Sequence, residues 1–200
     1  MIDESRQTDA VNSSSVEIPT EDEVKEPPPV EPKSPQYSDD AFRDAAMNGK
    51  TEVVRSALDS GTEVNAAGPD GRIALQLAAF NGHTPIVKFL LQRGAMVNHR
   101  DATGRTALMY AATADNADTV EALLNAKADV NVADGDEGFT ALMFAAAEGQ
   151  AKVVKLLLDA GADPNVKDID GEDALLFAKQ KNHVAVIELL NEVATTPNEE

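Results

Sequence analysis

Apolar residues recur along residues 39–191 in short clusters that polar turns separate. In the first kind of cluster a leucine and two alanines stand at i, i+3 and i+4, as Leu75, Ala78 and Ala79 do, so they share one face of a helix. After a polar break, a second kind of cluster carries larger apolar residues, as in residues 86–91. The pattern predicts pairs of short amphipathic helices.

The helix pairs recur at a nearly constant stride. The glycines that precede the first helix of a pair are 33, 34 and 33 residues apart, and they are Gly71, Gly104, Gly138 and Gly171. The asparagines that follow a pair are 33, 33 and 34 residues apart, and they are Asn65, Asn98, Asn131 and Asn165. Because one helix pair cannot bury its apolar face alone, this stride predicts a stacked array of repeats.

Polar residues predict where the helices begin and end. Thr106, Thr140 and Asp173 stand before the first helix of a pair and suit the capping position. Ile73 cannot cap, so that helix start is expected to be weaker by about 1 kcal/mol. Between the two helices of a pair, Asp115 and Asn182 stand near the position of a glycine, and we expect them to take its left-handed conformation.

One helix pair, which contains residues 117–125, is expected to be the least stable. Lys127 replaces a terminal glycine there, and Thr119 and Ala122 replace larger apolar residues. Since the stability of an array is a sum of repeat and interface terms, we expect faster amide hydrogen exchange in this segment than in residues 152–159.

The first and last copies differ from the others as end repeats should. Asp44 stands where later copies carry an apolar residue, and Lys179 and Asn191 replace an alanine and a leucine in the last copy. The predicted organisation is a tail in residues 1–38, a repeat domain of about five copies in residues 39–192, and a frayed end in residues 193–200.

The tail is acidic and holds six of the ten prolines of the chain. We expect it to be disordered, with polyproline II character in residues 27–32. That segment suits an aromatic-lined groove of a partner, although a stiff acidic spacer is the simpler interpretation.

The repeat resembles the ankyrin repeat family. The phrase Gly-x-Thr-Ala-Leu-x-x-Ala-Ala begins at Gly104, and Gly-Ala-Asp-x-Asn fills residues 161–165. Alanines stand where the family prefers proline, and Gln76 and two methionines stand where it prefers histidine. The resemblance implies an all-α solenoid of paired antiparallel helices with β-turn or hairpin connections.

The resemblance also implies a non-catalytic module that binds a protein partner through the concave face of the first helices and the hairpin tips. The expected contact residues on this surface are Arg72, Leu77, Phe80, Asn81, Arg100, Arg105, Tyr110, Thr113, Phe139, Phe144, Glu148 and Phe177. The aromatic residues among them either face the partner or fill gaps between neighbouring helices. Phe80 and Phe139 are expected to be exposed contacts, and the three arginines are expected to form a local basic spot. Phe80→Ala and Arg105→Glu should then weaken binding and leave the melting temperature nearly unchanged.

Charge changes this picture only in the choice of partner. The net charge is −18 and the pI about 4.4, which disfavours nucleic acid and anionic membranes as partners. An acidic solubilising partner or chaperone of a basic protein is therefore the alternative function.

No cluster of residues predicts catalysis, a cofactor or a metal site. The chain has no cysteine, and its three histidines are scattered, with His83 and His183 at a position where the family has a structural histidine. The acidic stretch 133–138 fails the calcium-loop pattern and is expected to be a solvated hairpin tip. No signal peptide or membrane span is predicted, so we expect a cytoplasmic protein, if Met1 is the native start, that is monomeric when unbound.

Overall fold

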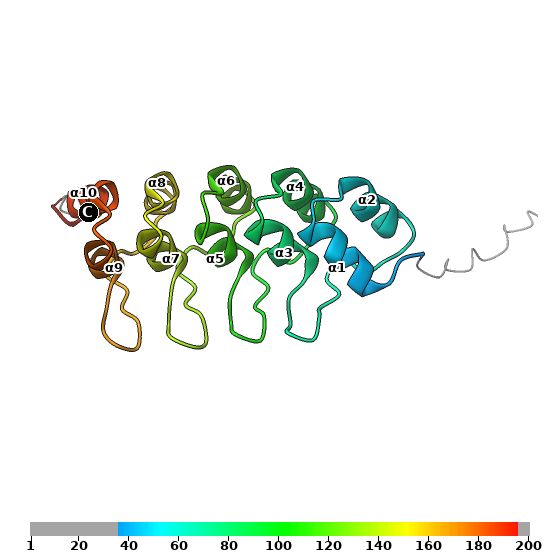
Figure 1. Cartoon of the computed structure of the whole chain (residues 1–200), viewed down its shortest axis with the longest axis horizontal. Coiled ribbons are helices and arrows are strands. Elements are labelled where there is room, and N and C mark those ends of the chain that lie inside the picture. The colour runs from blue at the N-terminus through cyan, green and yellow to red at the C-terminus, as the bar shows by residue number, and fades with distance from the viewer. Residues whose placement is uncertain (1–35, 196–200) are drawn as a thin grey trace, which may run out of the picture. The chain divides into compact units, whose positions relative to one another are not determined.

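The computed structural model describes residues 36–195, which form ten α-helices in five consecutive pairs (Figure 1). The helices are α1 (Asp39–Met47), α2 (Thr51–Asp59), α3 (Ala74–Phe80), α4 (Thr84–Gln92), α5 (Ala107–Ala112), α6 (Ala117–Asn125), α7 (Ala141–Ala147), α8 (Ala151–Asp159), α9 (Ala174–Gln180) and α10 (Val184–Thr195). The predicted all-α repeat solenoid is confirmed.

The odd-numbered helices form one row, here called the inner row, and the even-numbered helices form a second, outer row that lies above it in the view of Figure 1. Each helix packs against its pair partner and against the helix of its own row in the next pair. Leu75, Leu108 and Leu142 are buried along the inner row, and the half-buried Leu175 packs against the same core. The equivalent leucines therefore form one continuous spine, which is what burial of the paired faces requires.

The predicted helix caps are present. The side chains of Thr106, Thr140 and Asp173 accept hydrogen bonds from the third backbone amide of their helices. Ile73 makes no side-chain cap. Instead Gln76 accepts a 2.9 Å hydrogen bond from the Ile73 amide and donates a 2.7 Å bond to the Arg105 carbonyl. The helix without a cap is thus held from its first turn.

Left-handed residues end several helices, but not at both predicted places. Asn182 has φ 58°, as predicted, and Lys127 has φ 67° at the position of a terminal glycine. The prediction for Asp115 is wrong, because Lys127 and Asn182 are the non-glycine residues with positive φ in the described part of the chain. The helix before Asp115 ends earlier, with the C-cap residue Thr113 in right-handed conformation.

Hairpins join each pair to the next and extend from the inner row (Figure 1). Asp101, Asp134 and Asp168 each donate a backbone hydrogen bond across their hairpin, to the carbonyls of Arg105, Phe139 and Glu172 respectively. Neighbouring hairpins are connected by backbone bonds from Ala102 to Asp70, from Gly135 to Thr103 and from Ile169 to Glu137, each 2.8–3.0 Å long. The predicted hairpin connections are confirmed.

The end copies expose the polar residues that the sequence singles out. Asp44, Lys179 and Asn191 are all exposed. Helix α10 runs to Thr195, past the predicted boundary at residue 192. The predicted tail up to residue 35 and the last residues 196–200 lie outside the described residues.

Candidate protein-binding surface

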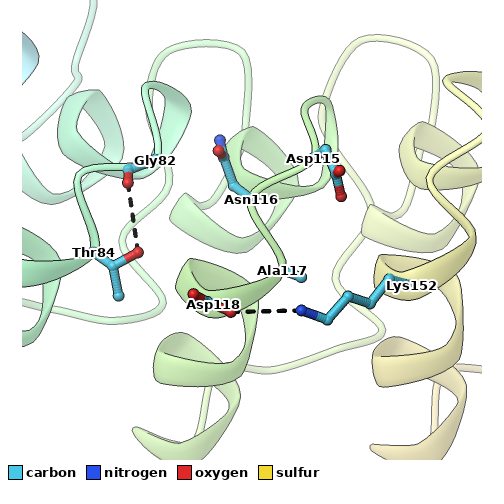
Figure 2. Close-up of a pocket in the computed structure, with 7 residues that line it drawn as sticks. All are labelled: Gly82, Thr84, Asp115, Asn116, Ala117, Asp118 and Lys152. Carbon is cyan, nitrogen blue, oxygen red and sulfur yellow. Dashed lines mark hydrogen bonds and ion pairs between the residues drawn. The ribbon is translucent and has the colours of Figure 1, made fainter.

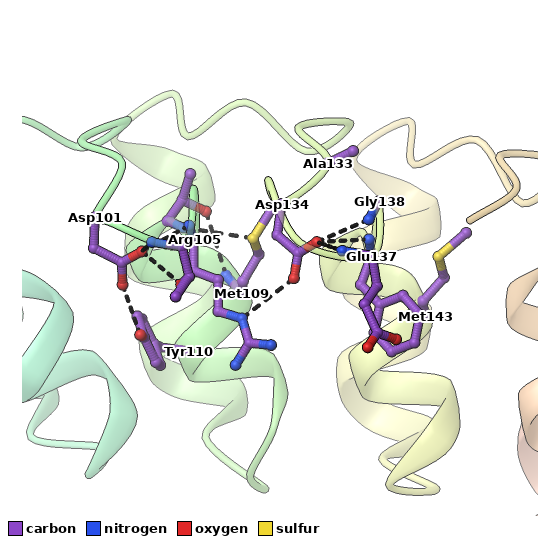
Figure 3. Close-up of polar contacts among 12 residues, drawn as sticks. Asp101, Arg105, Met109, Tyr110, Ala133, Asp134, Glu137, Gly138 and Met143 are labelled. Carbon is purple, nitrogen blue, oxygen red and sulfur yellow. Dashed lines mark hydrogen bonds and ion pairs between the residues drawn. The ribbon is translucent and has the colours of Figure 1, made fainter. Parts of the chain in front are cut away.

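The hairpin between α4 and α5, which is the second along the chain, is organised around a buried carboxylate (Figure 3). Asp101 is 8% exposed, and its Oδ1 accepts hydrogen bonds from the amides of Thr103 and Arg105 and from the Thr103 hydroxyl. The Tyr110 hydroxyl donates a 2.6 Å bond to Asp101 Oδ2. The carboxylate therefore closes the hairpin and ties it to helix α5.

These contacts change the acidity of both groups. Burial alone would raise the pKa of Asp101, but hydrogen bonds from Tyr110, Thr103 and the Arg105 amide outweigh it and lower the pKa below 3.8. Burial, followed by the bond to Asp101, raises the pKa of Tyr110 to about 12. Asp101 is thus a carboxylate and Tyr110 a phenol at neutral pH.

The third hairpin uses Asp134 in the same way (Figure 3). Its Oδ1 accepts hydrogen bonds from the amides of Glu137, Gly138 and Phe139, and its side chain is completely buried. Arg105 Nε lies 3.2 Å from Asp134 Oδ2. The prediction of a solvated acidic tip is therefore wrong for Asp134, although Glu137 is exposed.

The predicted basic spot is largely neutralised. Arg72 donates a 2.6 Å hydrogen bond to Asp70, and that bond lowers the pKa of Asp70. Arg105 is paired with Asp134, and its guanidinium carbon lies 4.9 Å from the centre of the Phe144 ring. Arg100 is exposed and donates to the Ala133 carbonyl. Two of the three guanidinium groups are thus neutralised by carboxylates, and all three contact a hairpin.

The aromatic side chains among the expected contact residues form two separate groups. Phe139 contacts Phe144 and Phe177 edge to face, with ring centres 5.4 and 5.1 Å apart, and all three rings are half-buried. Phe80 contacts Tyr110 in the same way at 5.9 Å, but Phe80 is 48% exposed. Phe144 and Phe177 therefore pack against the core and fill gaps between neighbouring helices. The expected exposure of Phe80 is confirmed, whereas that of Phe139 is wrong because its ring packs against two others.

The remaining expected contact residues lie along the inner helices. Leu77 and Thr113 are half-buried, and the Thr113 hydroxyl donates to the Tyr110 carbonyl. Asn81 is exposed, and its amide donates to the carbonyls of Met47 and Leu77. Glu148 is exposed at the end of α7.

The three histidines connect neighbouring repeats through hydrogen bonds to backbone carbonyls. A ring nitrogen of His83 donates a 3.0 Å hydrogen bond to the Met47 carbonyl at the end of α1, and a ring nitrogen of His183 donates one of the same length to the Ala147 carbonyl at the end of α7. His99 donates to the Gly71 carbonyl at 2.7 Å. Within the described residues, no three His, Cys, Asp or Glu side chains gather in a way that would hold a metal ion.

A pocket of about 260 Å³ lies where α6 begins (Figure 2). Asp118 pairs with Lys152 at 3.6 Å on its rim, and the Thr84 hydroxyl lies 2.7 Å from that of the fully buried Thr119. Throughout the part of the chain that the structure describes, every buried side-chain nitrogen or oxygen has a hydrogen-bond partner. The pocket therefore contains no buried polar side-chain atom that lacks a partner.

Two features of this surface were missed from sequence. The aspartates Asp101, Asp134 and Asp168 recur at intervals of 33 and 34 residues, and this stride was the signal for their shared role in the hairpins. The hydrogen bond from Gln76 to the next hairpin leaves no repeated pattern in the sequence, because Met109 and Met143 occupy the equivalent positions.

No helix among the described residues is both long and apolar enough to cross a membrane. No curated protein matches the chain. A family model for three ankyrin repeats matches residues 42–134, and a model for a single ankyrin repeat matches residues 137–169. Repeats of this kind are generally protein–protein interaction modules and are typically not enzymes. With its paired helices, linked hairpins and these two matches, the chain belongs to the ankyrin repeat family.

Proposed function

We propose that this chain is a non-catalytic module that binds another protein through the inner helices and hairpin tips. The observation that carries the proposal is the exposure of Phe80, at 48%, on the inner row beside Tyr110. Exposed aromatic side chains are frequent anchors at protein interfaces, where they bury a large apolar area.

The geometry divides the twelve expected contact residues by role. Arg105, Tyr110, Phe139, Phe144 and Phe177 are half-buried and contact either a buried carboxylate or another aromatic ring, so we assign them to the scaffold. The remaining seven stay as proposed contacts, and they are Arg72, Leu77, Phe80, Asn81, Arg100, Thr113 and Glu148.

The class of partner follows from charge. With a net charge of −18, the chain has little means to neutralise phosphates, so we propose a protein rather than nucleic acid or a membrane surface. We also propose that the unbound chain is a monomer, which sedimentation tests directly.

The alternative is an acidic solubilising partner or chaperone of a basic protein, which the same net charge favours. Salt separates the two functions. Binding driven by long-range charge should lose most of its affinity between low and moderate salt, whereas binding through Phe80 should lose only a modest part.

An affinity pull-down with the intact chain tests the proposal. The variant Phe80→Ala should lose the partners that the parent chain retains. The matched control is Val184→Ala, because Val184 is 56% exposed but lies at the start of α10 in the outer row. Equal capture by the parent and Phe80→Ala would overturn the assignment of the inner surface.

A further inference from the structure

A groove of about 400 Å³ lies between α1, the first hairpin and α3. Its apolar lining comes from Met47, Pro69 and Leu77. Its carboxylates are Asp40, Asp44 and Asp70, and its cations are Arg43 and Arg72. The groove thus combines an apolar surface with an excess of one negative charge.

The two arginines of the groove already have partners. Arg43, whose side chain is 8% exposed, pairs with Asp40 and also donates to the Ala66 carbonyl. Arg72 is held by Asp70. Asp44 is exposed, and its carboxylate has no ion-pair partner among the described residues. It is therefore the uncompensated charge of the groove.

The apolar side of the groove continues onto the next inner helix. Met47 is 39% exposed at the end of α1, and Phe80 is 48% exposed at the end of α3. The Asn81 amide donates a 3.1 Å hydrogen bond to the Met47 carbonyl, so the two helix ends are adjacent.

Asp44 is the first of a series of equivalent positions along the inner helices. Asp44 precedes Leu77 by one repeat of 33 residues, and it occupies the position that Leu77 and Tyr110 take in the next two copies. Packed helices are about 8–10 Å apart, and an extended peptide advances about 3.3 Å per residue. An extended peptide that runs along the inner helices therefore advances about three residues between one of these equivalent positions and the next.

Building on the proposed function, we infer that this groove binds an extended segment of the partner protein with an arginine or lysine three residues from a large apolar side chain. The cation pairs with Asp44, and the apolar side chain packs one repeat further along the row, against Leu77 and Phe80 beside Met47. An acidic segment is disfavoured because it would face Asp44 while the guanidinium groups of Arg43 and Arg72 remain occupied by carboxylates.

The test is a selection of random peptides displayed on phage against the intact chain, with the Asp44→Lys variant used to remove non-specific binders. The expected result is enrichment of a basic residue three positions from Leu, Ile, Phe or Met. A synthetic peptide of the enriched sequence should bind Asp44→Asn about two- to fivefold more weakly than the parent chain. It should lose measurable binding to Asp44→Lys.

The control variant is Asp136→Asn, which removes an exposed carboxylate at another hairpin tip and should leave the affinity unchanged. Circular dichroism should show equal melting temperatures for the parent and the Asp44 variants. Enrichment of acidic peptides, or of none, would overturn the inference. If the peptide lost affinity with Phe80→Ala but not with Asp44→Asn, this inference would fail while the proposed function stood.

Discussion

The hydroxyl of Tyr110 and the carboxylate of Asp101 are joined by a 2.6 Å hydrogen bond between an inner helix and its own hairpin. Tyr110→Phe removes the donor and leaves a buried carboxylate oxygen without this partner. We expect a loss of about 1–2 kcal/mol in the free energy of unfolding, measured by urea denaturation. Tyr37→Phe is the control and should change stability by much less, and equal losses in the two variants would contradict this role of the bond.

The same pair predicts how stability depends on acid. Because the pKa of Asp101 is lower in the folded chain than its ordinary 3.8, its contribution is fully present above that value and is lost as the pH falls through the folded pKa. Asp101→Asn should reduce the acid dependence of the unfolding free energy below about pH 4. Parallel curves for the parent and the variant would rule out a lowered pKa.

At alkaline pH the stability that Tyr110 contributes is lost as the pH rises, which is the opposite of the dependence on Asp101. The pKa of Tyr110 is raised to about 12, so its contribution is present below its ordinary value of 10.0 and is lost as the pH rises toward 12. The chain has two tyrosines, so ultraviolet titration of the Tyr37→Phe variant reports Tyr110 alone. A midpoint near 10 in the folded variant would contradict the burial and hydrogen bond described here.

Gln76 offers a test of contacts between repeats. Gln76→Met keeps a side chain of similar size, and its sulfur can accept from the Ile73 amide as those of Met109 and Met143 accept from Thr106 and Thr140. The substitution leaves the Arg105 carbonyl without its donor. We expect a loss of about 2 kcal/mol in the free energy of unfolding. Gln150→Met makes the same chemical change at a half-buried position in another repeat, and a comparable loss there would refute the bridging role.

Lys127 tests the predicted least stable pair. Its φ of 67° disfavours a side chain, whereas Gly94 and Gly161 hold the equivalent positions in other copies with φ of 85° and 89°. Lys127→Gly should stabilise the chain by about 1 kcal/mol and slow amide exchange in α6, and Gly161→Lys should destabilise it by a similar amount. A Lys127→Gly variant no more stable than the parent would show that the left-handed residue is not strained.

Arg105 and Phe80 separate folding from binding. The sequence predicts that substitution of either residue leaves the melting temperature unchanged, but Arg105 pairs with the completely buried carboxylate of Asp134. Arg105→Glu should therefore cost about 2–3 kcal/mol of stability. Phe80→Ala should cost at most about 1 kcal/mol, because it removes one edge-to-face contact and a half-exposed ring. Thermal melts of both variants distinguish these outcomes.

The stride of leucines and alanines was enough to predict a stacked array of helix pairs, because one pair cannot bury its apolar face alone. The resemblance to ankyrin repeats supplied the antiparallel pairing and the hairpins. Single-residue properties also predicted the caps at Thr106, Thr140 and Asp173. The candidate surface was harder to predict. Whether Phe139 faces solvent depends on Phe177 in the next repeat, and whether Arg105 is free depends on Asp134, so exposure at these positions is decided by neighbours about one stride away. The wrong expectation for Asp115 has a local origin instead, because the preceding helix ends at Ala112.

The backbone bonds between adjacent hairpins have a mechanical consequence. Each of the three junctions from Asp70 to Ile169 has one such backbone bond at the tips, beside side-chain contacts such as that of Arg105 with Asp134. A backbone bond of this kind contributes only about 1 kcal/mol net. The helical rows are therefore the stiff side of the array and the tips its compliant side. A partner that contacts two neighbouring tips is therefore expected to displace them more readily than the helices.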